Sequence, residues 1–128
     1  MQKSGIGPEV IYFDGGRRMV NGKASSYILR PETVESFFIL NQLTGDPVYR
    51  EWGWEIYQSI ERFCKTEYAY GGINHVDNKF DNPTNKMESF FLAETLKYLY
   101  LLFDPDTEID LLNKVRKIIP FNRLTFSS

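Results

Sequence analysis

The chain has 128 residues, of which 42% are hydrophobic and 16% aromatic, and this composition indicates one folded unit rather than a disordered segment. It carries 15 Lys and Arg against 17 Asp and Glu, and a net charge of -2 excludes the strongly basic surface that gathers nucleic acid or anionic membrane. The single cysteine, Cys64, excludes an intrachain disulfide and a cysteine-rich zinc site, and we expect it to fill space in the core.

The first 26 residues, Met1–Ser26, are rich in glycine and polar residues. Gly15-Gly16 and Asn21-Gly22 are turn signals beside short apolar stretches. This segment is predicted to be a loop or a short hairpin. It lacks the apolar stretch of a signal peptide, and the chain has no apolar run of about 18 residues, so we expect no membrane contact here and any targeting signal to lie outside this chain.

Two helices joined by a tight turn are predicted next. Pro31 suits a first helical position, so the first helix is predicted from about Pro31 to Leu43. The turn Thr44–Pro47 offers a glycine for a left-handed C-cap, then Asp and Pro for a new helix start. The second helix is amphipathic, and we expect Trp52 in its buried face, because these residues recur at three- and four-residue steps: Tyr49, Trp52, Gly53, Ile56, Ile60, Phe63 and Cys64.

The stretch from Tyr68 to Thr84 is predicted to be an exposed connection, since it contains Gly71-Gly72 and several Asn and Asp residues. A third helix is predicted from Met87 to Phe103, with Asn85 as its N-cap and burial on most sides, because its residues are apolar nearly all round. The fold class is therefore expected to be all-α, built of helical hairpins.

Acidic residues interrupt both the first and the third helix. Arg30, Glu32 and Glu35 lie within six positions, and the two acids share a helix face. Phe90 and Glu94, four residues apart, also share a face.

These residues allow two interpretations. In the structural one, Arg30 pairs with Glu32 or Glu35 at the helix start, while Glu88 and Glu94 cap the third helix or face solvent. In the functional one, the carboxylates line a sugar pocket with an aromatic floor, since glycoside hydrolysis needs paired carboxyl groups.

The single histidine, His75, lies in the long connection and is interpreted as a loop residue, although a metal or acid–base role is conceivable. The nearby Asp77, Asn78 and Asp81 lack the spaced glycine and closing glutamate of a calcium loop, so they are interpreted as turn residues.

Two long segments carry a resemblance to a known family. The segment Tyr27–Ser36, which contains LRPETVES, and the segment Met87–Phe103, MESFFLAETLKYLYLLF, resemble signatures of the class I α-1,2-mannosidases, glycoside hydrolase family 47. Residues 43–47, 49–56 and 71–74 are similar to the family in order and spacing, and Gly7–Val10 is a fainter match. The resemblance covers about residues 5–112, so residues 1–128 are expected to be a partial catalytic domain with a divergent tail at 113–128.

The resemblance implies a fold and an activity. The chain would supply the C-terminal helical hairpins of an (α/α)7 barrel. Family members remove terminal α-1,2-linked mannose from high-mannose N-glycans by an inverting, calcium-dependent hydrolysis. They work in the lumen of the endoplasmic reticulum or Golgi, often as type II membrane proteins.

By the same resemblance, Glu32 would be the catalytic base that activates water, while Arg30 and Glu35 would shape the network of sugar and water around it. An inverting enzyme holds two carboxyl groups roughly 6.5–9.5 Å apart with water between them.

The third helix would supply the rest of the substrate site. Phe90 would form the apolar floor under the reacting mannose, Glu94 would hold water and sugar hydroxyls near calcium, and Glu88 would have a supporting role. No direct metal ligand is expected in this chain; Glu32, Glu35 and Glu94 would reach calcium through water.

Two departures from the family bear on activity. The proton-donating acid of the family lies upstream of the matched region, and the family motif FNTEAHP, whose Thr binds calcium, is replaced here by Val115–Leu124. We therefore expect the isolated chain to hydrolyse little. Two alternatives are a non-catalytic, lectin-like helical module that recognises high-mannose glycoproteins in quality control, and an unrelated helical scaffold.

Overall fold

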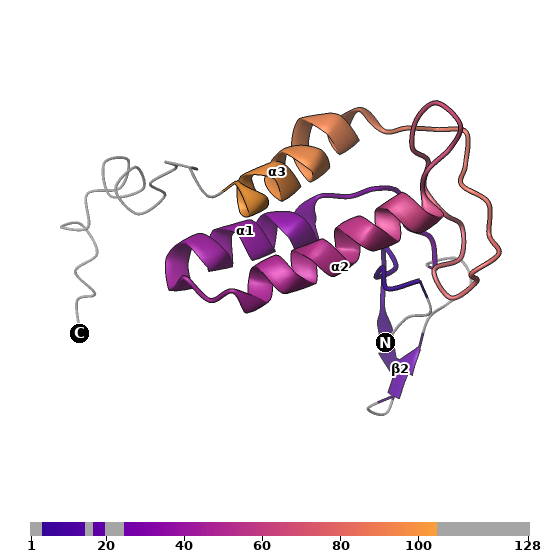
Figure 1. Ribbon diagram of the computed structural model, residues 1–128. Coiled ribbons are helices and arrows are strands. Elements are labelled where there is room, and N and C mark those ends of the chain that lie inside the picture. The colour runs from indigo at the N-terminus through magenta and orange to yellow at the C-terminus, as the bar shows by residue number, and fades with distance from the viewer. Residues whose placement is uncertain (1–3, 15–16, 20–24, 105–128) are drawn as a thin grey trace, which may run out of the picture.

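The computed structural model describes residues 4–14, 17–19 and 25–104. Its elements, in chain order, are β1 (Tyr12–Asp14), β2 (Arg17–Met19), α1 (Glu32–Thr44), α2 (Val48–Phe63), the π-helix η1 (Phe91–Leu96) and α3 (Lys97–Phe103). The three α-helices lie side by side, and the strands project from them as a separate hairpin (Figure 1). The apolar stretch and tail after residue 104 lie outside the described residues.

The N-terminal segment forms the expected short hairpin. β1 and β2 pair antiparallel, with Phe13 opposite Arg18. The two residues between the strands, Gly15 and Gly16, are of the type that two-residue hairpin turns favour. Of the two predicted forms, a loop or a short hairpin, the strand pairing shows the hairpin.

The turn between α1 and α2 is built as its sequence predicts. Gly45 adopts a left-handed conformation with φ of 70°, and its N–H donates a 2.8 Å hydrogen bond to the Asn41 carbonyl. Asp46 then accepts a 2.9 Å hydrogen bond from the N–H of Val48 at the start of α2. This turn reverses the chain within a few residues, so α1 and α2 form a helical hairpin.

The side of α2 that faces α3 differs from the prediction. Trp52 is 45% exposed and lies against the rings of Phe37 and Tyr49, with centroid distances of 5.6 and 5.7 Å. The contact with α3 is made at Gly53, where an added Cβ would collide with Leu102. The prediction of a buried Trp52 is wrong, because Gly53 makes the close approach to α3, while the indole packs against Phe37 and Tyr49 and stays partly exposed.

The third helical segment differs from the prediction in its start, its form and its burial. Phe90 precedes η1 without a side-chain cap, so the predicted N-cap at Asn85 is wrong. Phe91, Thr95, Leu99 and Leu102 are buried, whereas other residues of the segment are exposed, such as Leu92 at 58% and Tyr100 at 68%. The prediction of burial on most sides is wrong for the described structure, because α1 and α2 cover one side of this segment.

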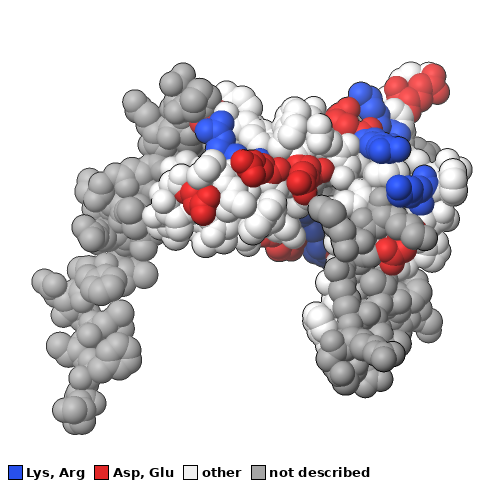
Figure 2. All heavy atoms as spheres, turned by 60° about the horizontal axis from the view of Figure 1, so that its bottom comes forward, with Lys and Arg blue, Asp and Glu red and all other residues white. Residues whose placement is uncertain are grey.

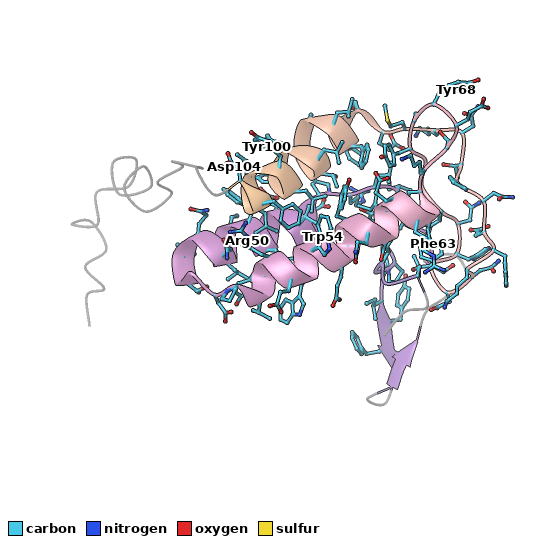
Figure 3. All side chains as sticks on the ribbon, viewed as in Figure 1. Arg50, Trp54, Phe63, Tyr68, Tyr100 and Asp104 are labelled. Atoms are coloured by element: carbon cyan, nitrogen blue, oxygen red, sulfur yellow. The ribbon has the colours of Figure 1, made fainter. Side chains whose placement is uncertain are left out.

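Exposed aromatic side chains lie where α2 meets α3. Trp54 on α2 and Tyr100 on α3 come from the two neighbouring helices in Figure 3, and both line an apolar cavity of about 300 Å³. Arg50, also on α2, donates a 2.9 Å hydrogen bond to the carbonyl of Phe103 at the end of α3, where a cation is favourable. The two helices are thus joined by apolar contact and by a capped carbonyl.

The connection after α2 is only partly exposed. Tyr68 and Phe80 are exposed as predicted, but Gly71, Gly72 and Ile73 are buried. Ile73 pairs with Tyr27 through two backbone hydrogen bonds of 2.9 Å. The buried part was not expected, and it fixes the segment that leads into α1.

The core gathers residues from all these parts of the chain and includes Cys64, which is fully buried as predicted. Its buried members are Ile6, Tyr27, Leu29, Val34, Ile60, Cys64, Ile73, Val76, Phe91 and Leu99.

Candidate functional site

Arg30 stands at the centre of the candidate site. Its Nε donates a hydrogen bond to Glu9, and its Nη1 lies 3.7 Å from the carboxylate of Glu32. Its guanidinium carbon lies 5.9 Å from the centroid of the Phe90 ring. The hydrogen bond with Glu9 is the largest cause that raises the pKa of Arg30, and the charges of Glu32 and Glu88 add to it. Arg30 therefore interacts with four side chains, those of Glu9, Glu32, Glu88 and Phe90.

Glu9 holds the segment from two sides. One carboxylate oxygen accepts a 2.8 Å hydrogen bond from the N–H of Ile28, while the other accepts the bond from Arg30. The Glu9 side chain is only 16% exposed, whereas that of Arg30 is 50% exposed, so Glu9 is the more buried partner of the pair. Sequence reasoning did not assign Glu9 to the site; the faint match at Gly7–Val10 was the available signal.

Glu35 and Glu94 lie around a different group, the phenol of Tyr98. The Tyr98 hydroxyl donates a 2.8 Å hydrogen bond to Glu35. This bond raises the pKa of Tyr98, with desolvation and the charges of Glu35 and Glu94 adding to the rise. Sequence reasoning missed Tyr98, which lies four residues after Glu94 and one helical turn along.

A cavity of about 700 Å³ lies beside the start of α1, between the N-terminal segment and α2. Its lining includes Glu9, Arg30, Glu32 and Ile56. Glu35, Phe90 and Glu94, although all three are described, are not in this lining. The predicted residues thus form two groups, one around Arg30 and one around Tyr98, linked through the contact of Arg30 with Phe90.

The Glu32 carboxylate is the accessible acid of the first group. Its side chain is 65% exposed, and the Arg30 cation is its partner in an ion pair. A carboxylate at a cavity wall can accept a proton from bound water. Around the helical layer, acidic and basic side chains are interspersed (Figure 2).

A metal ion requires several ligating side chains close together. Within residues 4–14, 17–19 and 25–104, no three His, Cys, Asp or Glu side chains gather closely enough to hold one. Residues 115–124, where the family carries its calcium-binding motif, lie outside this part of the chain.

The long connection uses its polar residues in turns, as predicted. Asp81 accepts a 2.8 Å hydrogen bond from the His75 N–H, and Asn78 accepts one of 3.1 Å from the Phe80 N–H. The ring Nδ1 of His75 lies 2.9 Å from the Ser25 hydroxyl.

Among the described helices, none combines the length and the apolar character needed to span a bilayer.

Comparison with known proteins places these features in a family. The sequence profile of Glycosyl hydrolase family 47 matches residues 1–118. The chain is 50% identical over 108 residues to human mannosyl-oligosaccharide 1,2-alpha-mannosidase IC, covering 83% of this chain and 17% of that protein. It is 48% identical over 115 residues to the human endoplasmic reticulum mannosyl-oligosaccharide 1,2-alpha-mannosidase, covering 84% of this chain and 16% of that protein.

A solved structure gives the same result. The alpha-1,2-mannosidase from Trichoderma reesei aligns with a TM-score of 0.64 and 40% identity, over 70% of this chain and 18% of that one. The chain thus spans less than a fifth of the length of these relatives. The predicted fold class, helical hairpins of an (α/α)7 barrel, is confirmed by the helical structure and this likeness. The chain belongs to glycosyl hydrolase family 47.

Proposed function

We propose that residues 1–128 form part of the catalytic domain of a mannosyl-oligosaccharide 1,2-α-mannosidase, which removes terminal α-1,2-linked mannose from high-mannose N-glycans. The observation that carries the proposal is the Glu32 carboxylate, which is held beside the Arg30 cation at the wall of a cavity. The two human relatives are named for the same activity.

Glu32 is the catalytic base in this proposal. Its exposed carboxylate takes a proton from the water that attacks the anomeric carbon, and Arg30 holds the ionised carboxylate in place. An inverting reaction also needs an acid that protonates the leaving oxygen. That acid is supplied by the part of the domain upstream of the matched region, so the isolated 128-residue chain is expected to release little mannose.

The remaining site residues bind and orient the sugar. Phe90 offers its ring as an apolar floor under the mannose, beside Arg30. Glu35 and Glu94 accept hydrogen bonds from sugar hydroxyls and water near Tyr98, and Glu88 supports the Arg30 charge.

Calcium is part of the proposal because family 47 enzymes are generally calcium-dependent. In the bound state it would supply electrostatic stabilisation of sugar hydroxyls. The described carboxylates would contact it only through water. The lumen of the endoplasmic reticulum or Golgi is the proposed location, by likeness to the named endoplasmic reticulum relatives.

The test replaces the part of human enzyme IC that this chain matches with residues 5–112 and keeps every other residue of that enzyme, including those at the position of the divergent Val115–Leu124. The purified chimera is incubated with a high-mannose glycan and calcium, and released mannose is followed by mass spectrometry. We expect release by the chimera and a loss of about 100-fold or more in Glu32→Gln, since general base catalysis contributes that much.

Glu55→Gln, on the exposed surface of α2, is the matched control and should release mannose like the parent chimera. A folded chimera that releases no mannose would contradict the proposal, and glycan binding without release would support the lectin-like alternative instead.

A further inference from the structure

Two uncommon backbone features lie next to the candidate site. The first is Leu29, a non-glycine residue with a φ of 69° and a fully buried side chain. A branched, bulky side chain disfavours the left-handed region, because its Cβ approaches the following carbonyl. Such conformations persist where the surrounding structure holds them, and they cluster at functional sites.

The second feature is the π-helix η1. Runs of π-helix are rare and occur frequently at functional sites. η1 lies directly after Phe90 and contains Glu94, two of the proposed sugar-binding residues. Within it, Thr95 is fully buried while Glu94 is exposed.

One hydrogen bond joins these features. The buried Thr95 hydroxyl donates a 2.6 Å hydrogen bond to the carbonyl of Leu29, across 66 positions in the sequence. That carbonyl belongs to the peptide unit whose N–H is contributed by Arg30. The bond therefore ties the π-helix, with its sugar-binding side chains, to the segment that carries the Arg30 cation and the Glu32 base.

The segment on either side of Leu29 is also fixed. Tyr27 is paired with Ile73 through two 2.9 Å hydrogen bonds. After Leu29, the Pro31 carbonyl accepts a 2.8 Å hydrogen bond from Glu35 as α1 begins. With both flanks held, the backbone conformation at Leu29 sets the direction in which Arg30 leaves the core.

We propose that Thr95 is a positioning residue: its hydrogen bond holds Leu29 in the left-handed conformation and thereby sets Arg30 against Phe90 and beside Glu32. This inference rests on the proposed mannosidase function. Its consequence is specific, because a loose base slows the chemical step more than it weakens sugar binding.

The test uses the chimera described above, with Thr95→Val and Thr95→Ser. Val keeps the branched shape and removes the donor, whereas Ser keeps the donor. We expect Thr95→Val to lower kcat by about 10- to 100-fold with KM changed less than about twofold, and Thr95→Ser to retain most of the parent kcat.

Thr44→Val is the matched control. It removes a hydroxyl that donates a 2.8 Å hydrogen bond to the Leu40 carbonyl on the exposed end of α1, away from the site. It should leave kcat unchanged. If Thr95→Val does not fold, Thr95→Cys replaces it, since a thiol is a weaker donor, and equal kcat values for the Cys and Ser variants would overturn the proposal.

A second readout does not depend on activity. In crystal structures of the chimeras, the parent and Thr95→Ser forms should keep Leu29 at a positive φ with Arg30 over Phe90, and Thr95→Val should lose one or both features. An inactive but folded parent chimera refutes the mannosidase function. The crystal structures then decide whether the Thr95 hydrogen bond holds Leu29 and Arg30 in place. An active parent with unchanged kcat and unchanged Arg30 geometry in Thr95→Val overturns the positioning role.

Discussion

Tyr98 connects two acidic side chains on different helices. It donates its hydroxyl to Glu35 on α1, and Glu94 from η1 lies within its electrostatic reach. Both effects oppose ionisation of the phenol, because the hydrogen bond requires the proton and the neighbouring charges repel a phenolate. Within this pair, Tyr98 is the donor and Glu35 the acceptor across the neutral pH range.

Replacing Glu35 tests this arrangement at the residue level. We expect Glu35→Gln to lower the pKa of Tyr98 toward the ordinary tyrosine value of 10.0, since the amide oxygen accepts only a weaker, uncharged hydrogen bond and the charge that repels a phenolate is removed. The measurement is an NMR titration of ring-labelled tyrosines, with the Tyr98 signal assigned by its disappearance in Tyr98→Phe. Glu51→Gln, on exposed α2, serves as control, and a Tyr98 pKa that does not move in Glu35→Gln would refute the coupling.

The connection between α2 and η1 depends on glycine at its buried turn. A Cβ built on Gly71 would overlap the backbone carbonyl of Thr84, and one on Gly72 would press on the carbonyl of Tyr27. The same stretch is held by hydrogen bonds from the Gly71 N–H to the Cys64 carbonyl at 2.8 Å and from the Thr84 N–H to the Gly72 carbonyl at 2.7 Å. Backbone neighbours cannot rotate away as side chains do.

At the level of this element, Gly71→Ala is therefore expected to lower the free energy of unfolding by about 3 kcal/mol, in the range of overpacking that forces backbone shifts. The matched control is Gly7→Ala, where nothing lies within 4 Å of the added Cβ, and a change within about 0.5 kcal/mol is expected. Urea unfolding followed by circular dichroism measures both. Equal stabilities of the two variants would show that the turn does not pack as described.

Across the whole molecule, several buried or hydrogen-bonded thiol and phenol groups have a higher pKa in the folded chain than in the unfolded one. Burial raises the pKa of Cys64 from 9.0 to about 12. A hydrogen bond to Glu61 raises the pKa of Tyr70 from 10.0 to about 12, and desolvation also raises that of Tyr27. Each raised pKa means that the unfolded chain releases its proton at lower pH than the folded one.

The sign follows from proton linkage. Above about pH 9 the unfolded Cys64 loses its proton first, so the unfolded state is favoured progressively, and stability falls until the folded thiol ionises near pH 12. For this one group the slope is about 1.4 kcal/mol per pH unit. We expect urea unfolding under reducing conditions to show that the contribution of Cys64 to the free energy of unfolding is constant below about pH 8. Above about pH 9 this contribution should decline.

Cys64→Ala should make that decline shallower, although it lowers stability at every pH through the space it leaves. A decline of the same steepness in Cys64→Ala would show that the thiol does not contribute.

Local patterns in the sequence were sufficient for much of this molecule. The turn Thr44–Pro47, the amphipathic period of α2, the N-terminal hairpin and the burial of Cys64 were all predictable. They depend on neighbours within a few residues or on the preference of one side chain for the core. The two long signatures likewise identified the family, because a match in the order of residue types does not depend on the structure.

The tertiary structure alone decided how the candidate site is held. The carbonyl of the left-handed Leu29 accepts its hydrogen bond from Thr95, 66 positions away, and the Arg30 side chain donates its hydrogen bond to Glu9, 21 positions away. The same is true of the exposed Trp52, since α3 meets α2 at Gly53, through Leu102, and not at the indole. Side-chain periodicity determines which residues lie on the same face of a helix or strand. Which segment packs against that face is decided by parts of the chain far away in the sequence, and this packing has no local signal.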